Sequence, residues 1–284
     1  MSSGLARRES APRTASGCVR SNRTSITTPK ASTATPASRR LSTVFVMSAV
    51  RNAVALDVQS LTVRYGDVTA VDSVSFVAHH GQVTAVLGRN GAGKTSVIEA
   101  CEGLRRTHGG SIALLGADAR HLPGEVRAKV GVMLQDGGIA PAARVRSTVR
   151  HYCALHGRGA DADQLIALVG LQHRETSSWR RLSGGERQRF SLALALAAQP
   201  EIAFLDEPSA GLDLDGREMV RTIISNLVMG GASVVLATHD LDEAERVADR
   251  VVVLHRGRVV VDDLLVNVCS GGRRLEDAVR EVTR

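Results

Sequence analysis

The sequence predicts an α/β fold built on a mainly parallel β-sheet. Short apolar runs typical of buried strands recur along the chain, and segments with helical periodicity lie between them. Strands that alternate with helices favour parallel pairing, because a helix carries the chain back to the start of the next strand. The 284 residues suffice for one large domain with a sizeable core.

The first predicted elements precede residue 110. Apolar residues alternate over 54–63 and 71–76, which predicts strands with one face toward a core. Residues 82–87 form a short, mostly apolar run suited to a buried strand. After a glycine loop, a helix is predicted whose apolar face carries residues 97–104 and which ends near Gly109.

The remaining elements complete the alternation. Residues 141–178 have helical character, and 202–205 forms another buried strand. An apolar stripe over 219–228 predicts a further helix. Strands are expected at 233–237 and over 251–261, the latter with a turn inside it.

The excess positive charge of +7 is confined to the first 46 residues. Taking their eight basic residues and one acid from the 36 and 29 of the whole chain leaves 28 of each. A nucleic-acid-binding domain more often has a basic excess on its folded part. The four cysteines are scattered without a C-x-x-C pair, which indicates neither a disulfide framework nor a zinc site. No apolar run reaches the roughly 18 to 20 residues that span a membrane.

Residues 1–46 form a basic leader with sixteen Ser or Thr and a single acid, which predicts disorder. Three interpretations stay open. The composition resembles an organelle transit peptide, and residues 38–41 faintly resemble a twin-arginine export signal. We favour the third, in which Met47 is the true start, because recognisable structure begins directly after it.

The strongest local motif fits G-x-x-x-x-G-K-[ST] and lies between a predicted strand and a predicted helix. Its glycines let successive N–H groups point at phosphate oxygens, and the helix N-terminus adds partial positive charge. Lys94 is expected to neutralise the β- and γ-phosphates, and the Thr95 hydroxyl to bind Mg²⁺. The predicted nucleotide site comprises Gly88, Arg89, Asn90, Gly91, Ala92, Gly93, Lys94, Thr95 and Ser96.

Two carboxylates, Asp206 and Glu207, follow the predicted strand 202–205. The carboxyl ends of strands are where ligands of α/β sheets bind. Asp206 is expected to hold Mg²⁺, and Glu207 suits a general base that deprotonates the attacking water. Taken alone the pair is weakly diagnostic, because apolar strands that end in two acids are common.

A third motif, L-S-G-G-E-R-Q over 182–188, predicts the start of a helix. Ser183 and Glu186 have the spacing of a capping box. Gly184 and Gly185 leave backbone N–H groups open at the helix N-terminus, which makes a second anion site without a lysine of its own.

This heptapeptide resembles the signature motif of ABC (ATP-binding cassette) ATPases, and the surrounding motifs resemble that family in the same order over about residues 54–261. Tyr65, ahead of the phosphate loop, resembles the aromatic that stacks on adenine. Gln135 resembles the Q-loop glutamine, which contacts Mg²⁺ and couples the nucleotide to the membrane partner. Asp213 closes a segment similar to the D-loop, and His239 resembles the switch histidine that contacts the γ-phosphate.

The resemblance implies an ATPase with ATP and Mg²⁺ as ligands. It implies catalytic roles for Lys94, Gln135, Glu207 and His239, and metal contacts from Thr95, Gln135 and Asp206. It also implies that two such domains, as a homodimer, pair head to tail. Ser183, Gly184, Gly185 and Asp213 then contact the ATP held by the neighbouring copy.

For the fold, the resemblance implies a P-loop NTPase core with an antiparallel β subdomain and an inserted helical subdomain. We expect the ATPase domain at 47–265, its helical subdomain at about 137–181, and a short C-terminal segment at 266–284. The helical subdomain is expected to dock on a separate transmembrane permease.

Within the family, residues 131–157, 238–245 and 274–279 look like the drug- and polyketide-exporter subfamily, with Val279 in place of a closing aromatic. We therefore expect a subunit at the cytoplasmic face of the cell membrane that powers export of a drug-like or lipid-like substrate. The alternative is an ABC ATPase acting on ribosomes or DNA. Such proteins carry two cassettes or long insertions before the signature, whereas 88 positions separate Lys94 from Leu182 here.

Overall fold

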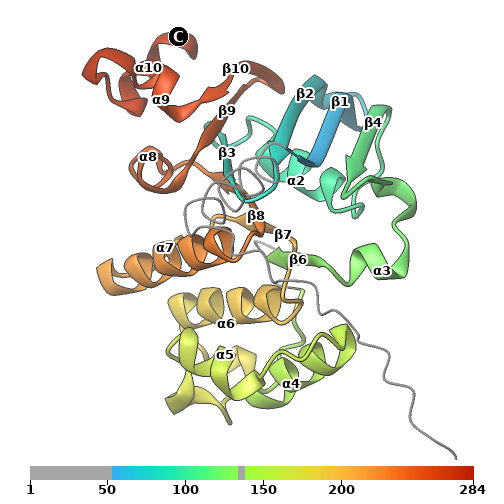
Figure 1. Ribbon diagram of the computed structural model, residues 1–284, viewed down its shortest axis with the longest axis vertical. Helices are drawn as coiled ribbons and strands as arrows, with labels where there is room; N and C mark the ends of the chain where they lie inside the picture. The colour runs from blue at the N-terminus through green and yellow to red at the C-terminus, as the bar shows by residue number, and fades with distance from the viewer. Residues whose placement is uncertain (1–52, 134–137) are drawn as a thin grey trace, which may run out of the picture. The chain divides into compact units, whose positions relative to one another are not determined.

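The computed structural model describes residues 53–133 and 138–284. Within them the chain forms two β-sheets with helices packed on both faces of the larger one (Figure 1). The leader 1–46 and Gln135 lie outside the described residues.

The first sheet is antiparallel, in the order β2-β1-β4-β5. Its strands are β1 (Val54–Tyr65), β2 (Val68–His79), β4 (Gly109–Leu114) and β5 (Ala117–Asp118). The alternation that predicted β1 and β2 matches their burial, because every second side chain of a strand faces the core. The sequence prediction missed β4. The helix expected to reach Gly109 ends at Cys101 instead, and Leu104 is 61% exposed.

The second sheet has six strands in the order β10-β9-β3-β8-β7-β6. All neighbours pair in parallel except β10 with β9. Its strands are β3 (Val83–Leu87), β6 (Val130–Met133), β7 (Ile202–Asp206), β8 (Ser233–Thr238), β9 (Arg250–His255) and β10 (Arg258–Leu264). The predicted α/β fold with a mainly parallel sheet and an antiparallel β subdomain is confirmed.

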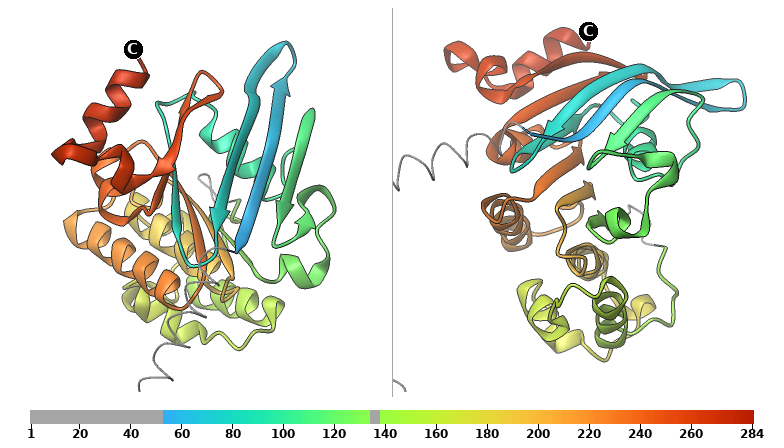
Figure 2. Two further views of the ribbon diagram at one scale, coloured as in Figure 1. Left: turned by 45° about the horizontal axis from the view of Figure 1, so that its top comes forward. Right: turned by 45° about the vertical axis from the view of Figure 1, so that its right-hand side comes forward.

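Helices lie in most of the connections between strands of the parallel sheet. They are α2 (Lys94–Cys101), α3 (Gly124–Arg127), α4 (Val145–His156), α5 (Ala162–Leu168), α6 (Gly184–Leu196), α7 (Leu214–Met229), α8 (Leu241–Val247), α9 (Leu265–Val268) and α10 (Leu275–Val282). Helix α6 contacts β6 and β7 on one side and α4 and α5 on the other, as both figures of the ribbon show (Figures 1 and 2). Helix α6, which begins at the L-S-G-G-E-R-Q motif, thus packs between the sheet and the inserted helices α4 and α5.

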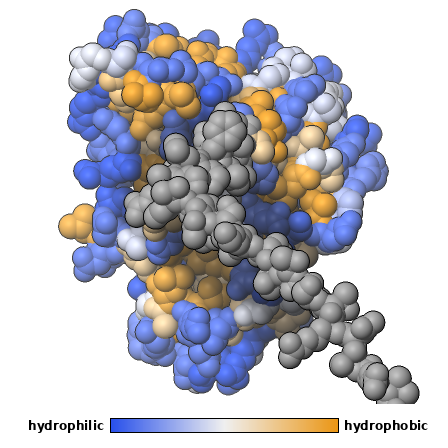
Figure 3. All heavy atoms as spheres, viewed as in Figure 1, coloured by the Kyte–Doolittle hydropathy of each residue, from blue (hydrophilic) through white to orange (hydrophobic). Residues whose placement is uncertain are grey.

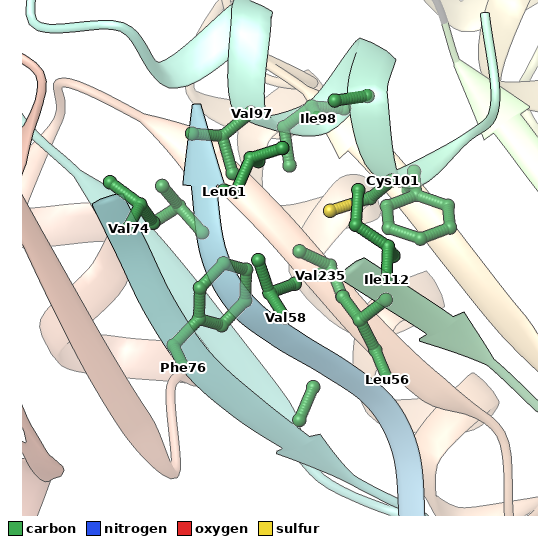
Figure 4. Packing of buried hydrophobic residues seen from close by; sticks show 14 of the residues in the cluster. Leu56, Val58, Leu61, Val74, Phe76, Val97, Ile98, Cys101, Ile112 and Val235 are labelled. Atoms are coloured by element: carbon green, nitrogen blue, oxygen red, sulfur yellow. The ribbon is translucent and has the colours of Figure 1, made fainter. Parts of the chain in front are cut away.

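Strand β8 shows how the sheet is buried on both faces. Val235 and Ala237 belong to a cluster that joins the two sheets around helix α2, whereas Val234 and Leu236 belong to a cluster with helices α6 and α7. Figure 4 shows the first cluster, in which Val235 lies among residues of α2 and the antiparallel sheet. Burying each such side chain contributes about 1.5–3 kcal/mol. This packing fixes α2, and hence the loop before it, against the ends of β7 and β8.

The surface seen in Figure 3 is mostly hydrophilic, with apolar residues in separate patches. In residues 53–133 and 138–284, no helix combines the length and the apolar character needed to cross a lipid bilayer.

Candidate active site

The phosphate loop connects β3 to α2, and two of its glycines are dictated by close contacts. A Cβ on Gly88 would lie 2.5 Å from the carbonyl oxygen of Leu254, and one on Gly93 would lie 2.6 Å from that of Ala70. Gly93 has φ +104, a left-handed conformation that side chains disfavour. No side chain caps the N-terminus of α2. The first N–H groups of this helix are therefore available to an anion.

Lys94 and Thr95 connect the loop to the carboxyl end of β7. The buried Lys94 ammonium donates to the Gly88 carbonyl at 2.9 Å and lies 3.7 Å from Glu207 Oε1. The Thr95 hydroxyl donates to Asp206 Oδ2 at 3.0 Å. The structure thus brings together two pairs of adjacent residues that lie more than a hundred positions apart in the sequence.

Asp206 has the features of a cation ligand. Its second oxygen, Oδ1, is buried and has no hydrogen-bond partner among the described residues. Burial raises the pKa of this carboxyl, which shows that an ionised Asp206 lacks full compensation by its own chain. A carboxylate oxygen and the adjacent Thr95 hydroxyl are ligands that Mg²⁺ accepts. The donor set therefore fits a hydrated Mg²⁺ ion at this edge of the sheet.

Glu207 is held by contacts from three directions. Its backbone N–H donates to the Ala237 carbonyl at 2.8 Å, and its own carbonyl accepts from the side-chain amide of Gln188. Its carboxylate lies 2.8 Å from His239 Nδ1 and accepts from the Thr238 hydroxyl at 3.3 Å. Glu207 also has φ +50, a strained conformation for a non-glycine residue that its partners must maintain. These contacts hold the buried Glu207 carboxylate at the carboxyl end of β7, beside the phosphate loop.

Tyr65 ends β1 and is 42% exposed. Its hydroxyl lies 3.0 Å from the Ser96 hydroxyl, which ties it to helix α2. The Arg105 guanidinium lies over its ring, 5.0 Å from the centroid. One face of the ring therefore already makes a cation–π contact, while the exposure of the side chain leaves room for a planar group.

The signature helix α6 begins with the predicted capping box. Ser183 accepts from the Glu186 N–H, and the Glu186 carboxylate accepts from the Ser183 N–H at 2.8 Å. Arg174 adds an ion pair at 2.7 Å. The backbone bond from Ser183, with Arg174 assisting, lowers the pKa of Glu186 to about 2. The cap is thus a fixed, ionised structure, and the N–H groups of Gly184 and Gly185 have no hydrogen-bond partner in the described part of the chain.

The comparisons with known proteins agree on one family. The sequence profile described as "ABC transporter" matches residues 71–210. The chain is 35% identical, over 80% of its length and 74% of the relative's, to the daunorubicin resistance ATP-binding protein DrrA3 of Streptomyces coeruleorubidus. The chain belongs to the ABC transporter ATP-binding family.

Two further comparisons support this assignment. The sulfate/thiosulfate import ATP-binding protein CysA of Mycobacterium bovis is 38% identical over 72% of this chain, which spans 60% of that relative. A solved structure of an ATP binding subunit of an ABC transporter is 26% identical with a TM-score of 0.74, covering 81% of this chain and all of that one. This protein is accordingly an ATP-binding subunit of an ABC transporter and an ATPase. The alternative of an ATPase acting on ribosomes or DNA finds no support among these relatives.

The structure of this ABC subunit groups the predicted site residues into two sets. The phosphate-loop residues, Asp206, Glu207 and His239 form one set, and a cavity of about 380 Å³ beside it is lined by Arg89, Asn90 and His239. Ser183, Gly184 and Gly185 form the second, which makes no hydrogen bond or ion pair with the phosphate loop within the described residues. Asp213 caps helix α7 by accepting from the Gly216 N–H at 2.9 Å.

Four residues of the site were not predicted as members of it: Gln188, Ser209, Thr238 and Glu243. Each lies within or beside a quoted motif. Nothing in their spacing showed that Gln188 contacts the Glu207 carbonyl, or that Glu243 is buried among hydroxyl groups. These contacts depend on where helices α6 and α8 pack, which the local pattern does not specify.

Proposed function

We propose that this ABC subunit binds ATP with Mg²⁺ and hydrolyses it to power a separate transmembrane permease that exports a drug-like or lipid-like substrate. The observation that carries the hydrolytic part is the Glu207 carboxylate, held by His239 and Thr238 at the mouth of the phosphate loop. The resemblance to DrrA3 over most of both chains supports export. The similarity to the importer CysA covers less of the relative and leaves import as the second candidate.

In this proposal Lys94 exchanges partners when ATP binds. Its ammonium now satisfies the Gly88 carbonyl and lies near Glu207. Phosphate oxygens at the N-terminus of α2 offer it a stronger, charge-assisted partner. Lys94 then leaves Glu207 Oε1, and that carboxylate oxygen is free to accept a hydrogen bond from the attacking water. ATP binding and activation of the base are thereby coupled through one side chain.

Glu207 acts as the general base and His239 positions it. A water between the Glu207 carboxylate and the γ-phosphate transfers its proton to Oε1 or Oε2 as it attacks, and the resulting acid keeps the proton until phosphate leaves. His239, whose Nδ1 lies 2.8 Å from Oε1, orients the carboxylate and faces the γ-phosphate. Thr95 and Asp206 hold Mg²⁺, which when bound supplies neutralisation of the phosphate charge. Gln135, outside the described residues, is proposed as a further ligand.

The second set of residues explains the need for a dimer. The N–H groups of Gly184 and Gly185 form an anion site at the N-terminus of a 13-residue helix, yet no lysine accompanies them. We place the γ-phosphate held by the partner copy there, with Ser183 and Asp213 beside it. Tyr65 of the first copy stacks on the adenine.

The contact with the permease is placed on the helical subdomain, at about 137–181. A cavity of about 480 Å³ is lined by Tyr152 and His156 of α4 and by Leu194 of α6. Leu155 on the same helix is 70% exposed. A membrane subunit that docks here holds the ATPase domain, proposed as 47–265, at the cytoplasmic face of the membrane, with 266–284 as a C-terminal segment.

The test of the hydrolytic mechanism is a pair of variants in the full chain. Glu207→Gln should keep ATP binding and lower the turnover rate by about 100-fold or more, because general base catalysis contributes that much. Lys94→Ala should lose ATP binding itself. Parent-like turnover in Glu207→Gln would show that another group is the base.

The test of direction is efflux from cells that express the chain with its permease. Cells carrying the parent should accumulate less of a fluorescent, drug-like cation than cells carrying Glu207→Gln. Higher accumulation with the parent would identify an importer instead.

A further inference from the structure

Glu243 is a buried acid that the mechanism above does not use. It lies on α8, is 7% exposed, and contacts two hydroxyl groups, one from the loop that follows β7 and one from the end of β8. Its Oε1 is hydrogen-bonded to Ser209, the first residue of the D-loop, and its Oε2 lies 3.5 Å from the Thr238 hydroxyl. Thr238 in turn lies 3.3 Å from Glu207 Oε2. A continuous chain of hydrogen bonds therefore runs from the D-loop to the proposed base.

Thr238 is the link between the two carboxyl groups of this chain. The Thr238 hydroxyl accepts from the Asp240 N–H at 3.0 Å and has a single hydrogen, yet it faces two carboxylates. Glu207 Oε1 lies 3.7 Å from the Lys94 ammonium and 2.8 Å from His239 Nδ1. Glu243 has no cation within ion-pair distance in the described residues, and its burial raises the pKa of this carboxyl. The Glu243 side chain is therefore held by hydrogen bonds to Ser209 and Thr238, and Thr238 connects it to Glu207.

We propose that Glu243 is a positioning residue for ATP hydrolysis, which links Ser209 of the D-loop through Thr238 to the Glu207 carboxylate by hydrogen bonds. The inference rests on the proposed role of Glu207 as base. Through this chain of hydrogen bonds the D-loop is connected to Glu207 of the same subunit. A shift of Ser209 changes the bond to Glu243, then the orientation of the Thr238 hydroxyl, and finally the direction of the base.

The D-loop contacts the segment that, in the proposed dimer, binds the ATP of the partner copy. Leu212 lies 3.3 Å from the position that a Cβ on Gly185 would occupy, so the D-loop packs against the signature loop. In the proposed dimer the signature loop binds the partner's ATP. Closure of the dimer therefore moves the segment that begins at Ser209.

Three variants of the full chain test the inference. Glu243→Ala removes both hydrogen bonds and should lower kcat for ATP about tenfold while leaving KM unchanged, since a buried donor and acceptor lose their partners. Glu243→Gln keeps a donor and an acceptor and should stay within about twofold of the parent. Asp242→Asn, an acid on the same helix whose side chain is 67% exposed, is the matched control and should match the parent.

Ser209→Ala supplies an independent measurement that does not require loss of the buried acid. It should lower kcat to a similar extent, and the double variant Ser209→Ala, Glu243→Ala should fall no further, because both act through one chain of contacts. An unchanged kcat in Glu243→Ala, or an equal loss in Glu243→Gln and Glu243→Ala, would overturn the inference. Parent-like turnover in Glu207→Gln would instead overturn the assignment of the base, so the two failures are distinguishable.

Discussion

Replacing Glu186 by Gln isolates the charge that stabilises the start of the signature helix. Glutamine has nearly the same shape and can still accept from the Ser183 N–H, so the capping box survives. What is lost is the charge-assisted part of that bond and the ion pair with Arg174 at 2.7 Å. We expect a less stable protein at neutral pH.

The magnitude follows from the pKa of the carboxyl. The pKa of Glu186 falls from its ordinary 4.5 to about 2 in the folded chain. Each pH unit between these values corresponds to about 1.4 kcal/mol, so the difference sets an upper bound of about 3.4 kcal/mol. Arg174 has a side chain 42% exposed, and solvent screening weakens its share. We therefore expect Glu186→Gln to lower the free energy of unfolding by about 1–2 kcal/mol at pH 7.

The pH dependence has a defined sign. A carboxyl whose pKa is lowered by folding contributes its full stabilisation above the unfolded value of 4.5 and loses it as the pH falls toward 2. The difference in free energy of unfolding between the parent and Glu186→Gln, measured with urea, should thus be the same at pH 7 and pH 6 and smaller at pH 3.5. Glu218→Gln, whose side chain is 68% exposed, is the control and should change stability by less than about 0.5 kcal/mol. Equal stability of Glu186→Gln and parent at pH 7, or a difference that persists unchanged at pH 3.5, refutes the reasoning.

Two further predictions concern the phosphate loop and the core beside it. Gly93→Ala should weaken ATP binding at least about tenfold in a fluorescent-nucleotide titration, because φ +104 disfavours a side chain and the new Cβ would lie 2.6 Å from the Ala70 carbonyl oxygen. The control Gly124→Ala, where nothing lies within 4 Å, should bind like the parent. Glu102 has both carboxylate oxygens buried without a partner among the described residues, and burial raises its pKa to about 8. Ionisation of this buried carboxyl destabilises the folded state increasingly as the pH rises from 4.5 to 8. Glu102→Gln should therefore raise the free energy of unfolding, measured with urea, by about 1–3 kcal/mol at pH 8 and by much less at pH 5. Equal increases at both pH values would contradict this prediction.

The sequence predicted the elements whose periodicity is local. The buried strands and the alternating strands β1 and β2 follow directly from the spacing of apolar residues. The capping box at Ser183 was predicted because its two partners are three residues apart and need no tertiary contact. The phosphate loop was predicted for the same reason.

What the sequence missed depends on packing between distant segments. Strand β4 carries the glycines Gly109 and Gly110, which read as a helix end, and it exists because it pairs with β1. The C-terminal helix α10 was not predicted, although its apolar residues recur at helical spacing, and Leu275 is fully buried against α8. The positions of Glu243 beside Thr238 and of Gln188 beside Glu207 likewise follow from how their helices pack.

The measurement that tests the account most directly is affinity purification of the full chain from native membranes in mild detergent, followed by identification of what accompanies it. The account predicts a polytopic membrane protein, retained by the Glu207→Gln variant with ATP and recovered without ribosomes or DNA. Recovery only from the soluble fraction, with ribosomal or DNA-repair proteins attached, would keep the ATPase chemistry and contradict the transport function.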